Sequence, residues 1–358
     1  MYSGFFRALC LCCFALVSGS GAAGEPGGAI VSTFSIVAYD PQTGDYGVAV
    51  QSRYFSVGDV VPHASAGTGA VATQARGNLR YGFEGLELLA QGMPAGEVIS
   101  TLTGADPLSA ERQLGVVDRK GVPATFTGAD CLPWAGGLTG EHYAVQGNLL
   151  AGPQVVAAMA AAYEVAPGDL AERLVYALAA GQAAGGDARG RQSAAVLVVR
   201  ARGGYMGLTD RYVDLHVEDH ETPIRELRRL LQIRYADLAV GKATEAFDAS
   251  AAAEGDDRVK LLDQARDRAR EAVSLDPEDD GAWWLLARIE LAAGEREAAA
   301  AAGRRALLEN PSWRRLPPHT TAVLGVEPSF IEALTGIESF RRLWDSLAPP
   351  DEAPPPGP

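Results

Sequence analysis

The densest group of polar side chains in the sequence lies directly before an apolar segment. Asp187, Arg189, Gln192 and Ser193 follow one another closely, and the apolar run 192–199 is typical of a central strand. Asp187 and Arg189 could form an ion pair that holds the Ser193 hydroxyl beside a reactive group. A purely structural ion pair would explain these residues equally well, so both interpretations stay open.

Other polar residues near the ends of expected strands could contribute to a substrate site. Gly147 and Asn148 end a short strand pattern, where exposed backbone N–H groups could stabilise an oxyanion, although a simple turn would also explain them. Gln74 and Asn78 follow another strand pattern and could bind a substrate amide. His63, directly after Pro62, is a candidate pocket residue with no evident partner.

The sequence gives little indication of a metal or cofactor. His216 and His220 lie on a strand that runs into a turn, rather than on one helix face, so we expect no metal site there. The sequence contains no phosphate-binding loop, dinucleotide-binding fingerprint or nucleophile elbow, and we expect no cofactor. Cys131 has no histidine near it in sequence and is expected to be a packing residue.

The strands and helices that must position these residues are grouped along the chain, strands with strands and helices with helices. The predicted strands are 33–39, 46–52, 68–74, 114–118, 123–127, 143–146, 192–199 and 212–217. The predicted helices are 81–91, 95–103, 154–164 and 169–180, and a further helix begins at Pro223. Strands in antiparallel runs and helices in pairs do not match the strict alternation of a parallel βαβ fold. Two sheets between two helical layers would fit this order.

From about residue 233 the composition changes to alanine, charge and helix. Leu275-Asp276-Pro277 recurs as Glu309-Asn310-Pro311 after 34 residues, which is the period of tetratricopeptide repeats. The helix-packing positions of that repeat fall on Trp283, Leu286, Ala287, Gly294, Ala299 and Ala306. We expect about two repeats within 233–347, with 329–347 as a capping helix, and a disordered tail at 348–358. Because two repeats rarely suffice for a free-standing stack, they should dock on the preceding domain or form a homodimer.

The N-terminus predicts export. Arg7, the apolar run 8–17 and the small residues 18–23 follow the pattern of a secretory signal, so we expect a signal peptide at 1–23 and a secreted or periplasmic protein. The chain of 358 residues carries a formal net charge of -14. Such an acidic surface repels phosphates and anionic lipids, and we expect neither nucleic acid nor, after signal removal, a membrane as a partner.

Seven short sequence strings follow one another in a characteristic order along about 160 residues of the chain. They are TFSIVA at 33–38, GVAVQS at 47–52, GTGAVATQA at 67–75, QLGVV at 113–117, FTG at 126–128, YAVQGN at 143–148 and GQAAGGDARGRQSAA at 181–195. In these strings the chain resembles the domain-of-unknown-function 1028 family, a branch of the N-terminal-nucleophile hydrolase superfamily. The resemblance implies an α+β domain at 33–231 with a four-layer αββα sandwich, followed here by the all-α repeat region.

The resemblance also implies a role for Thr33, at the head of the first strand. In this superfamily the hydroxyl of such a residue attacks the substrate, and its own α-amino group, which titrates near pH ~7.7, takes up the proton. Arg53 could lie near that amine and lower its pKa by charge repulsion, or could be an ordinary surface residue. Because 32 residues precede Thr33, its amine becomes free only if the chain is cut between Ser32 and Thr33.

Two classes of function follow from these observations. The first is an exported amidohydrolase that acts on a peptide or amide bond through Thr33. The alternative is a non-catalytic domain that binds a small ligand or peptide, with the helical repeats recruiting a protein partner. The N-terminal residue of the mature chain discriminates between them.

Overall fold

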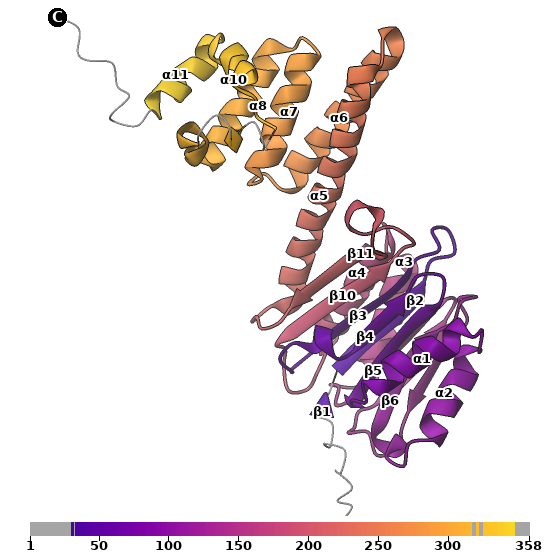
Figure 1. Ribbon diagram of the computed structural model, residues 1–358. Coiled ribbons are helices and arrows are strands. Elements are labelled where there is room, and N and C mark those ends of the chain that lie inside the picture. Colours follow the sequence, from indigo (N-terminus) through magenta and orange to yellow (C-terminus); the bar gives the residue numbers. More distant parts are fainter. Residues whose placement is uncertain (1–29, 32, 317–319, 322–324, 348–358) are drawn as a thin grey trace, which may run out of the picture.

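The structure of the chain is a computed structural model that describes residues 30–31, 33–316, 320–321 and 325–347. The expected signal peptide at 1–23 and the expected tail at 348–358 lie outside these residues. The described part is a mixed α and β protein, with two sheets near the N-terminal side and a helical region after them (Figure 1).

All strand pairs within the two sheets are antiparallel. The six-stranded sheet has the order β11-β10-β3-β2-β9-β8. Its members are β2 (Thr33–Tyr39), β3 (Tyr46–Ser52), β8 (Gly136–Gly140), β9 (Tyr143–Gly147), β10 (Ser193–Val199) and β11 (Arg211–Val217). In the five-stranded sheet β5 pairs with β1, β4 and β6, and β6 pairs with β7. Its members are β1 (Ile30–Val31), β4 (Pro62–Ser65), β5 (Gly69–Arg76), β6 (Arg112–Val117) and β7 (Pro123–Thr127).

The β2–β3 hairpin lies at the centre of the six-stranded sheet. Its strands are rich in β-branched and small apolar residues, and residues 33–38 and 46–52 are buried on both faces. The turn between them closes with a hydrogen bond of 2.8 Å from the Gly44 amide to the Asp40 carbonyl, and Gly44 takes a φ of 79°, which favours glycine. The resulting register pairs Thr33 with Ser52.

Three apolar clusters hold the sheets and their helices together. One includes Val48, Ala70 and Leu197 and joins the inner faces of the two sheets. A second packs the outer face of the six-stranded sheet against α3 (Gln154–Val165), α4 (Leu170–Ala183) and the start of α5 (Pro223–Ala252). A third packs the outer face of the five-stranded sheet against α1 (Arg80–Ala90) and α2 (Ala95–Gly104). The two sheets therefore share one core and carry helices on their outer faces.

The helix α5 links the two parts of the protein (Figure 1). Leu227 and Leu231, in its first turns, belong to the cluster of the six-stranded sheet. Ala239 and Ala243 belong to the cluster of the helical region. The domain boundary expected at residues 231–233 thus falls inside a continuous helix of 30 residues.

The helical region continues with antiparallel pairs. Its helices are α6 (Gly255–Leu275), α7 (Asp280–Ala292), α8 (Arg296–Glu309), α10 (Pro328–Thr335) and α11 (Glu338–Ser346). Ala287, Ala299 and Ala306 are fully buried, so that α7 and α8 approach closely, and Gly294 follows α7 with a φ of 87°. The single capping helix expected at 329–347 is wrong, because the chain turns at Gly336 and extended Ile337 and so forms two short helices.

Candidate functional site

A row of three hydroxyl groups lies at one end of the adjacent strands β2, β3 and β10 of the six-stranded sheet. Thr33 begins β2, and the strand register places it opposite Ser52 of β3, which lies opposite Ser193 of β10. All three side chains are buried. The Thr33 hydroxyl donates to the Ser52 hydroxyl at an Oγ1–Oγ distance of 3.2 Å. Because Ser35 and Val37 share the face of Thr33 and contact the other sheet, this row faces the space between the two sheets.

The backbone of Thr33 is held by the residue that ends β9. The Thr33 amide donates to the Asn148 carbonyl at 3.4 Å, and the Asn148 amide donates to the Thr33 carbonyl at 3.0 Å. The exposed N–H group expected at Asn148 is therefore not present in this chain, because the Asn148 amide already donates to the Thr33 carbonyl. The Asn148 side chain turns inward, where its Nδ2 donates to Gln113 Oε1 at 3.0 Å.

Buried amide side chains connect the two sheets beneath Thr33. Gln146 Nε2 donates to the Ser35 hydroxyl at 2.6 Å, and that hydroxyl donates to Gln74 Oε1 at 2.6 Å. Gln74 Nε2 then donates to Gln113 Oε1 at 2.8 Å and to the Thr33 carbonyl at 3.4 Å. All four of these side chains are fully buried. We call Ser35, Gln74, Gln113, Gln146 and Asn148 the amide network.

Only part of this network was expected from the sequence. Gln74 and Asn148 were candidates, whereas Ser35, Gln113 and Gln146 were missed. The signal that could have found the glutamines is an amide side chain inside an otherwise apolar strand pattern, as in QLGVV and YAVQG.

The loop before β10 is organised by one buried carboxylate. Asp187 accepts hydrogen bonds from the backbone amides of Arg53 at 3.0 Å and Arg189 at 2.9 Å. The Arg189 guanidinium completes the arrangement with an ion pair of 2.8 Å to Asp187. Arg53 itself is exposed, beside Ser52. Asp187 thus fixes the end of β3 next to the hydroxyl row.

The Ser193 hydroxyl forms its hydrogen bonds with the segment that follows β3. Its hydroxyl donates to the Tyr54 carbonyl at 2.5 Å and accepts from the Val57 amide at 3.2 Å, at the start of η1 (Val57–Asp59). Ser193 lies opposite Ser52 in the sheet and holds the loop after β3 in place. These contacts of its hydroxyl do not include a hydrogen bond to Thr33.

His63 and Asn78 do not join this site. His63 pairs with Val71, which packs against the helices on the outer face of the five-stranded sheet, and its ring lies edge-on against Phe83. Burial lowers the pKa of His63, so the neutral ring is favoured. Asn78 lies at the start of α1, where its Nδ2 donates to Asp106 Oδ2 at 3.3 Å.

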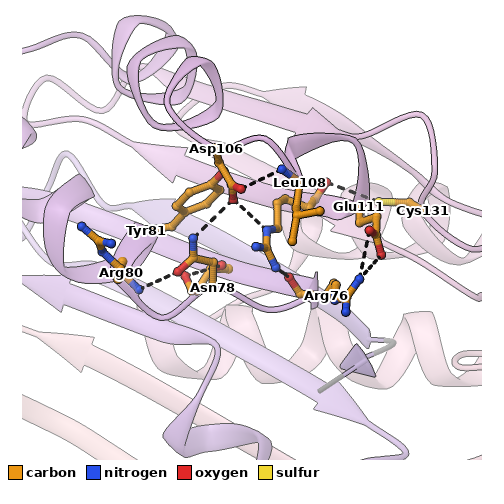
Figure 2. A network of polar contacts seen from close by, with 10 residues as sticks. Arg76, Asn78, Arg80, Tyr81, Asp106, Leu108, Glu111 and Cys131 are labelled. Carbon is orange, nitrogen blue, oxygen red and sulfur yellow. Dashed lines mark hydrogen bonds and ion pairs between the residues drawn. The ribbon is translucent and has the colours of Figure 1, made fainter. Parts of the chain in front are cut away.

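Asp106 is the centre of a second polar network (Figure 2). Tyr81 Oη and Arg112 Nε each donate to Asp106 Oδ2 at 2.8 Å, and the Leu108 amide donates to Oδ1 at 2.9 Å. Burial alone would raise the pKa of Asp106, but the hydrogen bonds from Arg112, Leu108 and Tyr81 lower it to about 2. Since Arg112 precedes Gln113 in β6, this ion pair anchors the strand that carries part of the amide network.

Cys131 also contacts this second network. Its thiol donates to the Arg112 carbonyl at 3.3 Å, and burial raises the pKa of the thiol. A protonated, hydrogen-bonded thiol is a poor nucleophile, which agrees with a packing role.

One group of potential metal ligands occurs among the described residues. Atoms of Asp59, His216 and Glu218 lie within 4.8 Å of one another, with His216 Nδ1 at 3.7 Å from a carboxylate oxygen of each partner. His216 Nε2 lies 3.0 Å from Asp214 Oδ1, and this hydrogen bond raises the pKa of His216. The three carboxylates around the ring favour the protonated imidazole, a form that does not bind a metal ion. His220 lies outside the group.

The described helices include none that is both long and apolar enough to cross a membrane. The model of the family of unknown function DUF1028 matches residues 33–227. A crystal structure of a protein from Silicibacter pomeroyi, described as a member of the same family, is similar with 32% sequence identity and a TM-score of 0.52. That similarity covers 56% of this chain and 88% of the other. No curated protein matches the chain.

Proposed function

We propose that this chain, which belongs to the DUF1028 family of unknown function, is an exported N-terminal-nucleophile amidohydrolase that acts on a peptide or amide bond through Thr33. In this proposal the two sheets and their outer helices form the αββα sandwich of that superfamily. The helical region serves as a tetratricopeptide-like module for a protein partner, and the signal peptide sends the protein out of the cytoplasm.

The observation that carries the proposal is the position of Thr33. This residue lies at the point where the chain passes from one sheet to the other. β1 ends at Val31 and pairs with β5 of the five-stranded sheet, whereas β2 begins at Thr33 in the six-stranded sheet. β2 is held on both sides by ladders to β3 and β9. A cut before Thr33 would therefore free its amine without removing β2 from its sheet.

The surroundings of Thr33 suit the chemistry. A free Thr33 amine could take the proton from its own hydroxyl, because an α-amine titrates near pH ~7.7. In the processed chain the Thr33 hydroxyl would direct its proton to the free amine instead of to Ser52, and the Ser52 hydroxyl, 3.2 Å away, would orient the Thr33 oxygen by donating to it. The amide network would fix the Thr33 carbonyl through Gln74 Nε2. The site would thus be positioned before a substrate arrives.

In the intact chain, however, Thr33 is fully buried and its nitrogen is part of a peptide bond. In this proposal the chain as folded here is an inactive precursor, and a cut before Thr33 creates the base. If the chain is not cut before Thr33, the burial of Thr33 favours the second candidate function, that of a non-catalytic binding domain.

Intact-mass analysis of the exported protein tests the proposal. A mature chain that begins at Thr33 and gains the mass of a β-lactone probe at that residue would support it. Thr33→Ser should retain acylation and Thr33→Ala should abolish it. Thr73→Ala is the matched control, because Thr73 is also a buried strand threonine, but its hydroxyl donates to the Asn78 carbonyl. A mature chain that begins at Gly24 would overturn the catalytic mechanism and leave the binding domain.

A further inference from the structure

A cavity of about 750 Å³ lies between the C-terminal half of α4 and the first turns of α5. Its charged and polar lining consists of Gln182, Arg191, His220, Thr222, Arg225, Glu226, Arg228, Arg229 and Gln232. Its apolar wall includes Ile224, which belongs to the cluster on the outer face of the six-stranded sheet. The cavity is therefore separated by this sheet from the hydroxyl row of Thr33.

The lining is strongly basic in a protein of net charge -14. It contains four arginines and one carboxylate, Glu226, which pairs with Arg229 at 3.0 Å. Among the described residues, Arg191, Arg225 and Arg228 have no carboxylate partner. Three guanidinium groups thus face one cavity without a counter-charge from the protein.

Three of the four arginines lie close together at the start of α5. Arg225, Arg228 and Arg229 are spaced by three and four residues and so share one face of the helix, where like charges repel. They also lie in the first two turns, where the partial positive charge of the helix N-terminus adds to the repulsion. Ile224 and Leu227 on the adjacent face are buried, whereas the three arginines are exposed.

Two further polar groups line the same cavity. His220 Nδ1 accepts a hydrogen bond of 2.9 Å from the Thr222 amide, which leaves Nε2 as the protonated nitrogen of a neutral ring and hence a donor. Gln182 Oε1 is buried and has no hydrogen-bond partner among the described residues. A ligand here would meet several cationic donors and the Nε2–H donor of His220.

We propose that this cavity binds a small molecule that carries at least two negatively charged groups, either phosphates or carboxylates. Guanidinium groups bind both through paired, charge-assisted hydrogen bonds. The proposal does not depend on Thr33, because the cavity lies on the opposite face of the sheet.

Calorimetric titration of the full chain with inorganic pyrophosphate and, separately, with citrate tests the proposal, with sodium chloride at equal ionic strength as the baseline. Saturable binding of either anion supports it, and the stronger of the two identifies the anionic group. Arg225→Gln combined with Arg228→Gln should weaken binding about 100-fold, or roughly tenfold for each lost guanidinium, which corresponds to about 1.4 kcal/mol per residue.

The matched control combines Arg119→Gln with Arg304→Gln, two exposed arginines outside the cavity that have no ion pair among the described residues. This control should bind as tightly as the wild type. Chemical modification of arginines gives a readout on the unaltered chain, since the bound anion should protect Arg225 and Arg228 but not Arg119 and Arg304. Binding no stronger than that of chloride, or equal weakening in both double variants, would overturn the proposal.

Discussion

Thr33 and Ser52 face each other across the β2–β3 hairpin, and the Thr33 hydroxyl donates to the Ser52 hydroxyl at 3.2 Å. Both residues are fully buried. Ser52 is also the cross-strand neighbour of Ser193, whose hydroxyl is fixed by the loop after β3. Ser52 therefore couples the proposed nucleophile to the rest of the sheet.

Replacing Ser52 by alanine should slow acylation of processed Thr33 by about 10-fold to 100-fold, since one positioning hydrogen bond contributes about 1–3 kcal/mol. The measurement is the rate at which a β-lactone probe adds to the mature chain, followed by intact mass. Ser250→Ala is a suitable control, because Ser250 is a buried serine in α5 whose hydroxyl donates to the Phe247 carbonyl. Equal rates in Ser52→Ala and Ser250→Ala would show that Ser52 has no positioning role.

The amide network predicts a stability difference between two glutamines of similar burial. Gln113→Leu should lower the free energy of unfolding by about 3 kcal/mol, because buried donors of Gln74 and Asn148 lose their acceptor. The Gly147 carbonyl also loses its donor, Gln113 Nε2, at 2.7 Å. Urea unfolding of the full chain measures the change.

The same substitution at Gln51 provides the control. Gln51 is fully buried, and neither atom of its amide has a hydrogen-bond partner among the described residues. Gln51→Leu should leave the free energy of unfolding unchanged or raise it by about 1 kcal/mol, because an unpaired buried amide is unfavourable. A similar loss in Gln113→Leu and Gln51→Leu would mean that side-chain shape, rather than hydrogen bonding, determines the effect.

How far the sequence predicts this fold depends on how local each signal is. The predicted ranges 33–39 and 46–52 coincide with β2 and β3, because long apolar patterns with a turn between them specify a hairpin. The strands β1, β4 and β8 were not predicted. β8 has the sequence Gly-Gly-Leu-Thr-Gly, which carries almost no side-chain signal, and it is a strand only because it pairs with β9.

The same distinction applies to the polar residues. The contact between Asp187 and Arg189 could be anticipated because the two residues are close in the chain. The hydrogen bonds from Gln113 Nε2 to the Gly147 carbonyl and from the Ser35 hydroxyl to Gln74 Oε1 join strands from different sheets, and no local pattern encodes such contacts. Asn78 and His63 illustrate the converse error. Both were candidates for the substrate site, but His63 packs against Phe83 on the outer face of the five-stranded sheet, and the Asn78 side chain donates to Asp106.

Acid should destabilise the protein partly through Asp106. The pKa of this carboxyl is about 2 in the folded chain and ~3.9 when unfolded, so its stabilising effect is complete above about pH 5 and is lost as the pH falls toward 2. Asp106→Asn should cost about 3 kcal/mol at pH 7, because it leaves buried Arg112 without its charge partner. Urea unfolding from pH 7 to pH 2.5 should show the difference between wild type and variant shrinking with falling pH. A difference that stays constant over this range would exclude Asp106 as the titrating group.

The continuous helix α5 predicts where the α/β part of the chain can be shortened. Beyond Leu231, Arg234 Nε donates to the Tyr212 carbonyl at 3.0 Å, and Tyr235 Oη donates to Asp169 Oδ1 at 2.5 Å. A chain that ends at Leu231 should therefore be about 2 kcal/mol less stable than one that ends at Lys242, since both hydrogen bonds are lost. Tyr235→Phe in the full chain should account for about half of this difference in urea unfolding. If the two shortened chains unfold at the same urea concentration, residues 232–242 of α5 contribute nothing to the stability of the sheet domain, and the helix belongs to the repeat region from residue 232 onward.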